Sequence, residues 1–146
     1  MYSDAQEMGR IMAIDYGQKR VGIAVTDEQK LIANGLTTVH VKDIFLFLAD
    51  YVSHNPVERF VVGEPKTLRN EKSDSARFVD PFVKKLKKTF PAIPVSRVDE
   101  RFTSVLAHRV MLDAGLGKMA RRNRELVDTI SATMILQSWM ELMDQK

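Results

Sequence analysis

The sequence predicts an α/β domain whose five-stranded mixed sheet has three antiparallel strands followed by parallel strands, with helices flanking it. Three patterns lead to this prediction. Near the N-terminus, short segments alternate apolar and polar residues and are joined by short connections, which is typical of antiparallel neighbours. Further along, apolar strands alternate with helical segments, which is typical of parallel strands with crossover helices. The 146 residues suit a single domain, expected at residues 9–146 after a polar tail at residues 1–8.

The individual elements follow from the spacing of apolar residues and from the residues that interrupt it. The expected strands are residues 10–16, 20–26, 31–39, 57–63 and 94–100. The expected helices are residues 42–54, 75–89, 103–114 and 124–143. Asn55-Pro56 ends the first helix, and Pro81 either kinks the second helix or lies in its first turn. Residues 64–74 are expected to form a polar loop.

The composition limits the class of protein. The chain contains no cysteine, which excludes disulfides and thiolate metal sites and makes a reducing cytoplasm the simplest setting. Its net charge of +3 permits a nucleic-acid partner without requiring one. The longest apolar run, residues 44–49, is far shorter than the ~20 residues of a membrane span, so no membrane association is expected. The three histidines lack the spacing of a zinc site and are expected at the surface.

Asp15 is the first candidate for a functional carboxylate. It closes the first expected strand and shares a face of the sheet with Ile11 and Ala13. A carboxylate near a covered face is costly unless it is paired or bound to a cation. The alternative is a turn aspartate, which the Asp-Tyr-Gly sequence at residues 15–17 also favours.

The second candidate lies at the end of the last expected strand, within Asp99-Glu100-Arg101. Neighbouring strand residues point to opposite faces, so only one of the two acids can reach a common site. Val98 shares its face with Glu100, which favours Glu100 as the functional acid and leaves Asp99 as the other choice. A surface salt-bridge cluster is the alternative.

Asp128 is the third candidate, near the start of the last expected helix. At about 100° per residue, Ala132, Ile135 and Trp139 lie within about 40° of Asp128 on the helical wheel. An acid in the first turns of a helix also balances the helix dipole. That alternative explains an acid at this end of the helix but not its place at the head of an apolar stripe.

The three acids are distant in sequence, two at strand ends and one at a helix start. If they converge, their hard oxygen ligands select Mg²⁺ or Mn²⁺. A pair of such ions about 3.5–4 Å apart activates water and stabilises the leaving oxygen of a phosphodiester. The sequence therefore predicts Asp15, Glu100 and Asp128 as catalytic, metal-binding residues, with Mg²⁺ or Mn²⁺ as the cofactor.

Of two basic segments, one is a candidate for contact with nucleic acid. Glycines at 115 and 117 introduce a cationic segment beside the expected acidic site, which suits a phosphate backbone. Its cations are Lys118, Arg121, Arg122 and Arg124. A solvated linker is the alternative. Four lysines around Leu86 indicate a solvated helix face instead. These are Lys84, Lys85, Lys87 and Lys88.

The chain resembles the YqgF family of RNase H-like nucleases, which are relatives of Holliday junction resolvases. The matching stretches are Ile14-Asp15-Tyr16-Gly17, Lys19-Arg20-Val21-Gly22-Ile23-Ala24-Val25, Val61-Val62-Gly63 with Pro65, Asp99-Glu100-Arg101-Phe102-Thr103, and Val127-Asp128 through Ala132 to Leu136-Gln137. These motifs cover nearly the whole chain. Glu64, where the family often has leucine, and the loop that follows it depart from the family pattern, so substrate contacts by that loop are not carried over.

The resemblance implies an RNase H-like fold, dependence on Mg²⁺ or Mn²⁺, and a role in maturing the 5′ end of 16S ribosomal RNA in the bacterial cytoplasm. By position, Asp15, Glu100 and Asp128 match the acidic site of the family. Arg20 and Arg101 lie in its motifs and are expected to contact phosphate. The expected partner is nucleic acid, either structured RNA or branched DNA, bound by a monomer or a weak homodimer.

Three other functions remain open. A Holliday junction resolvase in DNA recombination and repair would need two symmetric sites, so dimerisation would favour it. An actin-like nucleotide-binding module is suggested by Asp15-x-Gly17 and the basic residues that follow, but the chain has no second hairpin of this kind. A non-catalytic RNA-binding scaffold would tolerate loss of the acids.

Overall fold

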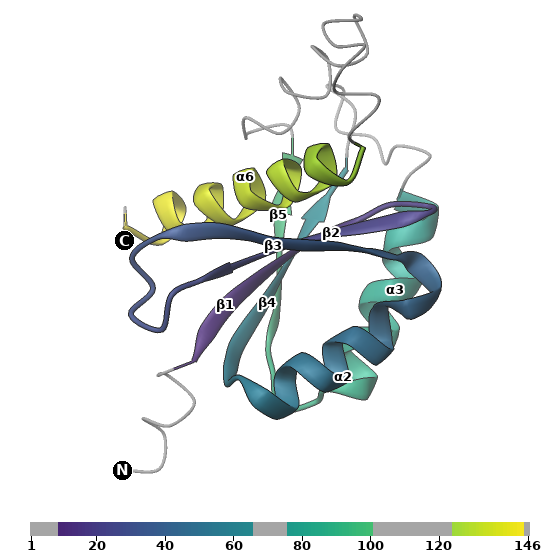
Figure 1. The fold of residues 1–146 in the computed structure, drawn as a ribbon, viewed down its shortest axis with the longest axis horizontal. Helices are drawn as coiled ribbons and strands as arrows, with labels where there is room; N and C mark the ends of the chain where they lie inside the picture. Colours follow the sequence, from purple (N-terminus) through teal and green to yellow (C-terminus); the bar gives the residue numbers. More distant parts are fainter. Residues whose placement is uncertain (1–8, 66–75, 101–123, 145–146) are drawn as a thin grey trace, which may run out of the picture.

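The computed structural model describes residues 9–65, 76–100 and 124–144. Their centre is a five-stranded sheet with the order β3-β2-β1-β4-β5 (Figure 1). The strands are β1 (Arg10–Tyr16), β2 (Arg20–Thr26), β3 (Ala33–His40), β4 (Val57–Glu64) and β5 (Val95–Asp99). The first three strands pair antiparallel, whereas β4 runs parallel to β1 and β5 runs parallel to β4. The predicted mixed sheet is confirmed.

Helices cover both faces of this sheet (Figure 1). On one face lie α2 (Ile44–His54), which follows a short 3₁₀ helix η1 (Val41–Asp43), and α3 (Ala76–Thr89). The long helix α6 (Arg124–Asp144) crosses the other face. None of the helices in the described ranges is long and apolar enough to cross a membrane.

Alternation along the strands builds two cores, one on each face of the sheet. Met12 and Ile14 of β1 are fully buried in the core beneath α2 and α3. Ala13, from the opposite face of the same strand, is buried with Ala132 and Ile135 of α6. Because Asp15 has the parity of Ala13, this packing directs it toward the α6 side at the end of β1.

The third strand starts two residues later than its apolar pattern predicts. Asp27 follows β2, and its Oδ1 accepts hydrogen bonds from the N–H groups of Leu31 at 2.7 Å and Ile32 at 2.9 Å. These backbone N–H groups, that of Ile32 foremost, hold the pKa of Asp27 below its ordinary value. Leu31 and Ile32 therefore belong to the turn, with exposed side chains.

The other differences are small. The helix predicted from residue 42 begins as the 3₁₀ turn η1, and Pro81 lies inside α3 on its exposed side, past the first turn. His40 and His54 are exposed, as predicted. The expected helix at residues 103–114, and His108 within it, lie outside the described residues.

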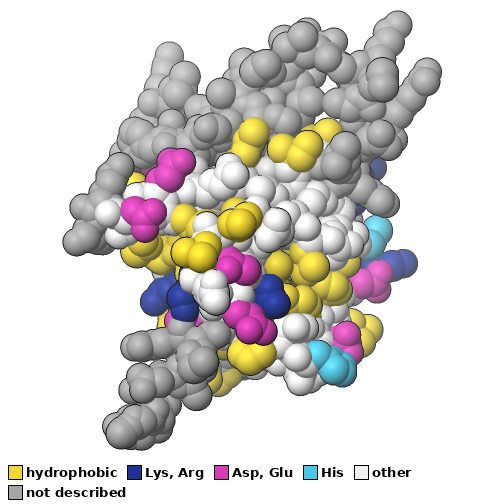
Figure 2. Space-filling model, turned by 60° about the vertical axis from the view of Figure 1, so that its left-hand side comes forward, with side chains coloured by type: hydrophobic (Ala, Val, Ile, Leu, Met, Phe, Trp, Pro, Cys, Tyr) yellow, Lys and Arg dark blue, Asp and Glu magenta, His cyan; other side chains and the backbone are white. Residues whose placement is uncertain are grey.

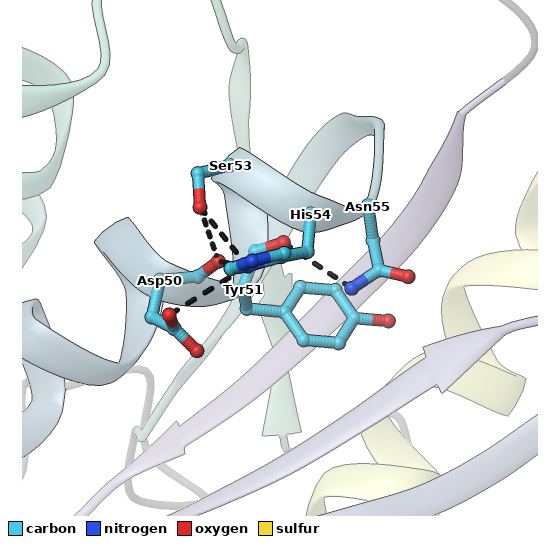
Figure 3. A network of polar contacts seen from close by, with 5 residues as sticks. All are labelled: Asp50, Tyr51, Ser53, His54 and Asn55. Atoms are coloured by element: carbon cyan, nitrogen blue, oxygen red, sulfur yellow. Dashed lines mark hydrogen bonds and ion pairs between the residues drawn. The ribbon is translucent and has the colours of Figure 1, made fainter.

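The C-terminal end of α2 is closed by its own polar side chains (Figure 3). The Asn55 side-chain Nδ2 donates to the Tyr51 carbonyl oxygen at 3.3 Å, beside the Asn55 backbone N–H at 2.8 Å, and the Ser53 hydroxyl donates to the Asp50 carbonyl at 2.7 Å. The Nδ1 atom of His54 lies 2.8 Å from the same carbonyl oxygen of Asp50. Local bonds of this kind satisfy carbonyls that a helix end leaves without partners, so α2 ends cleanly before Pro56.

Candidate active site

A cavity of about 310 Å³ opens at the carboxyl ends of β1 and β4. These two parallel strands mark the point from which the sheet extends in opposite directions, the usual place for a ligand in an open α/β sheet. The residues that line the cavity come from all three described ranges: Asp15, Tyr16, Gly17, Arg20, Gly63, Pro65, Val79, Glu100, Val127, Asp128 and Ser131. The three predicted acids are thus brought to the border of one cavity.

Asp15 reaches the cavity from the carboxyl end of β1. Its position is set by antiparallel pairing with β2, where Asp15 lies opposite Gly22. The side chain is partly buried, next to the core that α6 covers. The alternation of side chains along the strand predicted correctly that Asp15 lies on the covered face that Ala13 shares.

Glu100 follows the last residue of β5 and is only 3% exposed. A Cβ at Gly63 of β4 would lie 3.3 Å from the carboxyl carbon of Glu100 and 2.8 Å from Cδ1 of Ile135. A glycine at position 63 therefore leaves the room that the Glu100 side chain occupies beneath α6. Of the two neighbouring acids, Glu100 shares the α6 side of the sheet with the buried Val98, as the alternation predicted.

Asp128 is carried by α6, which approaches the sheet closely because glycine lies beneath it. A Cβ at Gly22 of β2 would collide with the backbone oxygen of Asp128. The first turns of α6 therefore rest directly on the β2 backbone. Ala132 and Ile135 continue the same face of the helix as fully buried residues, which confirms the predicted apolar stripe.

Arg20 pairs with Asp128 inside this cavity. The Arg20 Nε donates to Asp128 Oδ2 at 2.8 Å, and the two side chains are 32% and 22% exposed. Charge-assisted hydrogen bonds of this length are stronger than hydrogen bonds between neutral groups. Arg20 was predicted as a phosphate contact, and the structure adds that it shares the cavity with the acids and holds one of them.

The acids share a cavity without forming a compact metal centre. Among residues 9–65, 76–100 and 124–144, no three histidine, cysteine, aspartate or glutamate side chains are placed to hold a metal ion. The hydrogen bond from Arg20 directs the Asp128 carboxylate toward a guanidinium. The donor set itself, three carboxylates around one cavity, has the hard oxygen chemistry that Mg²⁺ and Mn²⁺ prefer.

Tyr16 and Ser131 line the cavity as well, although the sequence did not single them out as site residues. Tyr16 stacks on Phe82 of α3 with ring centroids 4.2 Å apart. Burial raises the pKa of the Tyr16 hydroxyl, so it stays protonated at neutral pH. Ser131 is 2% exposed and lies three residues after Asp128, one helical turn along the same face. That spacing was the signal that could have identified it.

The side chains of the remaining predicted site residues lie outside the described part of the chain. Arg101, Lys118, Arg121 and Arg122 lie outside the described residues. Arg124 begins α6, and its side chain also falls outside the described part.

Comparison with known proteins identifies the family. The family described as RuvX, Holliday junction resolvase, matches residues 9–142. A protein of Bacteroides thetaiotaomicron named "Putative pre-16S rRNA nuclease" is 58% identical over 134 residues, covering 92% of this chain and 97% of that protein. A protein of the same name from Porphyromonas gingivalis is 54% identical over 138 residues, with 94% and 100% covered.

A solved structure supports the fold. RuvC of T. thermophilus, determined in complex with a Holliday junction substrate, superimposes with a TM-score of 0.54 over 90% of this chain and 93% of that chain, at 17% identity. The fold is therefore the RuvC-like RNase H fold, as predicted.

On the strength of the family match and of relatives more than half identical over nearly their whole length, the chain belongs to the RuvX family, the YqgF family that its motifs predicted.

Proposed function

We propose that the protein is a Mg²⁺- or Mn²⁺-dependent endonuclease that hydrolyses phosphodiester bonds during 5′-end maturation of pre-16S ribosomal RNA. One observation carries the chemical part of this proposal: Asp15, Glu100 and Asp128, distant in sequence, border a single cavity at the carboxyl end of the sheet. The name shared by relatives more than 50% identical to the chain supports the ribosomal RNA substrate.

The three carboxylates are the residues that would hold the metal. A bound ion of this kind supplies an activated water and a stabilising charge for the leaving oxygen. Arg20, partly exposed at the cavity, is placed to act on the substrate and provides a guanidinium for a phosphate oxygen. Structured RNA in the cytoplasm is the proposed partner, bound by a monomer or a weak homodimer.

The test is cleavage of a precursor 16S RNA by the purified protein, with Mn²⁺ and with a chelator in its place. Cleavage is expected only with the metal. Asp15→Asn and Asp128→Asn are each expected to reduce the rate by at least about 100-fold, since even residues that merely orient a metal ligand cost 10–100-fold when changed. Asp144→Asn, at the exposed end of α6, removes the same charge far from the cavity and should cleave like the wild type.

Resolution of Holliday junctions is the second candidate, because the matching family is described as a resolvase. The same experiment separates the two when a four-way DNA junction is offered in parallel. Cleavage of the junction alone would replace the ribosomal substrate with branched DNA. Cleavage of neither substrate in Mg²⁺ or Mn²⁺ by a folded protein would overturn the nuclease proposal.

A further inference from the structure

Helix α3 holds an unusual share of the positive charge of the protein. Its 14 residues include five basic side chains and one acidic side chain, a net charge of +4, whereas the whole chain carries +3. On the face shown in Figure 2, by contrast, acidic and basic side chains of the described residues are interspersed with hydrophobic ones. A concentrated positive field of this kind attracts a polyanion.

Part of this charge faces a groove between α3 and the edge strand β5. The groove has a volume of about 570 Å³ and is lined by Asp80, Pro81, Val83, Lys84, Lys87 and Arg97. Arg97 projects from β5, and its Nη1 lies 3.7 Å from Asp80 and 3.8 Å from Glu64. These are loose contacts, so three cations share the groove with only partial neutralisation by two acids.

The groove and the acidic cavity are lined by neighbouring residues. Val79 of α3 lines the cavity, and the next residue, Asp80, lines the groove. On the strand side, Gly63 lines the cavity, and its carbonyl oxygen accepts a 3.5 Å hydrogen bond from Nη2 of Arg97. A strand of nucleic acid that leaves the cavity along α3 would therefore meet the groove directly.

The other lysines of α3 are placed differently. The Nζ of Lys85 lies 4.4 Å from the centre of the Phe45 ring of α2, in a cation–π contact on the side of the helix away from β5. Lys88 is exposed and does not line the groove. The lysines of one helix thus fall into a pair that faces the groove, Lys84 and Lys87, and a pair that does not.

We propose that the groove formed by Lys84, Lys87 and Arg97 binds the phosphate backbone of the RNA that flanks the bond in the acidic cavity. This inference rests on the proposed nuclease function and assigns a binding place to the part of the RNA outside the acidic cavity. Recognition is by charge rather than by base, because the described residues that line the groove supply three cations, one acid and apolar surface but no aromatic ring for base stacking.

The experiment compares two double variants with the same loss of charge from the same helix. Lys84→Gln/Lys87→Gln empties the groove of lysine, and Lys85→Gln/Lys88→Gln is the matched control. Binding of a precursor 16S RNA is measured by fluorescence anisotropy in a chelator, over a series of salt concentrations. All four lysines are exposed, so both variants should unfold at nearly the wild-type temperature.

The groove variant is expected to lose about tenfold in RNA affinity at low salt, and its slope of log K against log salt should shrink by about 1.4, or about 0.7 for each lost phosphate contact. The control should lose no more than about twofold. With an RNA too short to leave the cavity, the two variants should bind alike.

Equal losses in the two variants on the long RNA would overturn the groove and leave a diffuse charge effect. That outcome is distinct from failure of the nuclease proposal, because wild-type cleavage with Mn²⁺ is scored separately on the same RNA.

Discussion

The acidic cavity and the basic groove lie next to each other but are built in opposite ways. The cavity draws its charges from three distant segments and covers them in part, most fully at Glu100, which is 3% exposed. The groove takes exposed lysines from one helix and an arginine from one strand. Buried charges depend on close packing and on their partners, whereas exposed charges act at longer range and weaken with salt. Closely packed charges suit the chemical step at the cavity, and exposed charges suit attraction of a polyanion at the groove.

The ion pairs of the two regions show the same contrast. Arg20 and Asp128 meet at 2.8 Å with both side chains mostly covered. Arg97 lies 3.7–3.8 Å from its two acidic neighbours. The tight pair orients a carboxylate, whereas the longer contacts hold the Arg97 guanidinium less firmly.

The largest effect is expected where packing assembles the cavity. Gly22→Ala places a Cβ against the backbone oxygen of Asp128, and a backbone atom cannot turn aside. The variant should lose about 3 kcal/mol of unfolding free energy, the upper end for an overpacked site. Urea denaturation measures this loss.

Gly35→Ala is the control for that experiment. Its Cβ would meet the side-chain methyl of Thr129 on the same helix, whose hydroxyl is hydrogen-bonded to Thr38, so this side chain must shift and a smaller loss is expected than at Gly22, where the backbone must move. If Gly22→Ala were as stable as the wild type, α6 would not rest on β2 as described, and the cavity would lose the support that positions Asp128.

A smaller effect is expected from the tight ion pair. Arg20 donates to Oδ2 of Asp128, so its guanidinium competes with a metal ion for that carboxylate oxygen. A partly exposed pair is worth about 1 kcal/mol, so Arg20→Gln should tighten Mn²⁺ binding by about fivefold. Titration calorimetry measures the affinity without any turnover.

Lys19→Gln provides the comparison, since it removes the same charge from the exposed neighbouring residue. A general charge effect would tighten Mn²⁺ binding equally in both variants. That result would mean that the Arg20–Asp128 pair does not compete with the ion.

The smallest effect is expected in the groove itself. Asp80 is 41% exposed and opposes the cations there, so Asp80→Asn should raise RNA affinity by about twofold at low salt. The gain should vanish near 1 M salt, where the Debye length is about 3 Å. Anisotropy at the two salt concentrations measures it, with the exposed Asp43→Asn as control. A gain that persisted at high salt would point to a change of structure instead of charge.

The spacing of apolar residues in the sequence predicted much of the fold. Period-two alternation predicted the bounds of β1 and β2 and the face on which Asp15 lies, because strand side chains alternate whatever the neighbours are. The start of β3 was missed because Asp27 captures two backbone N–H groups, and a turn held by one side chain leaves no mark in the apolar pattern. The predicted solvated face of the α3 lysines is confirmed, since all four are exposed, but nothing near them in sequence indicates that Arg97 lies beside two of them.

The sequence by itself determined which face each acid would share with apolar neighbours, since helix and strand periods are properties of the local backbone. Only the tertiary structure decided that Asp15, Glu100 and Asp128 border one cavity, that Arg20 reaches Asp128 across 108 residues of chain, and that Arg97 joins Lys84 and Lys87. These meetings depend on strand order and on how closely α6 and α3 approach the sheet. Packing distances of that kind are set by all the contacting residues together and not by any one segment.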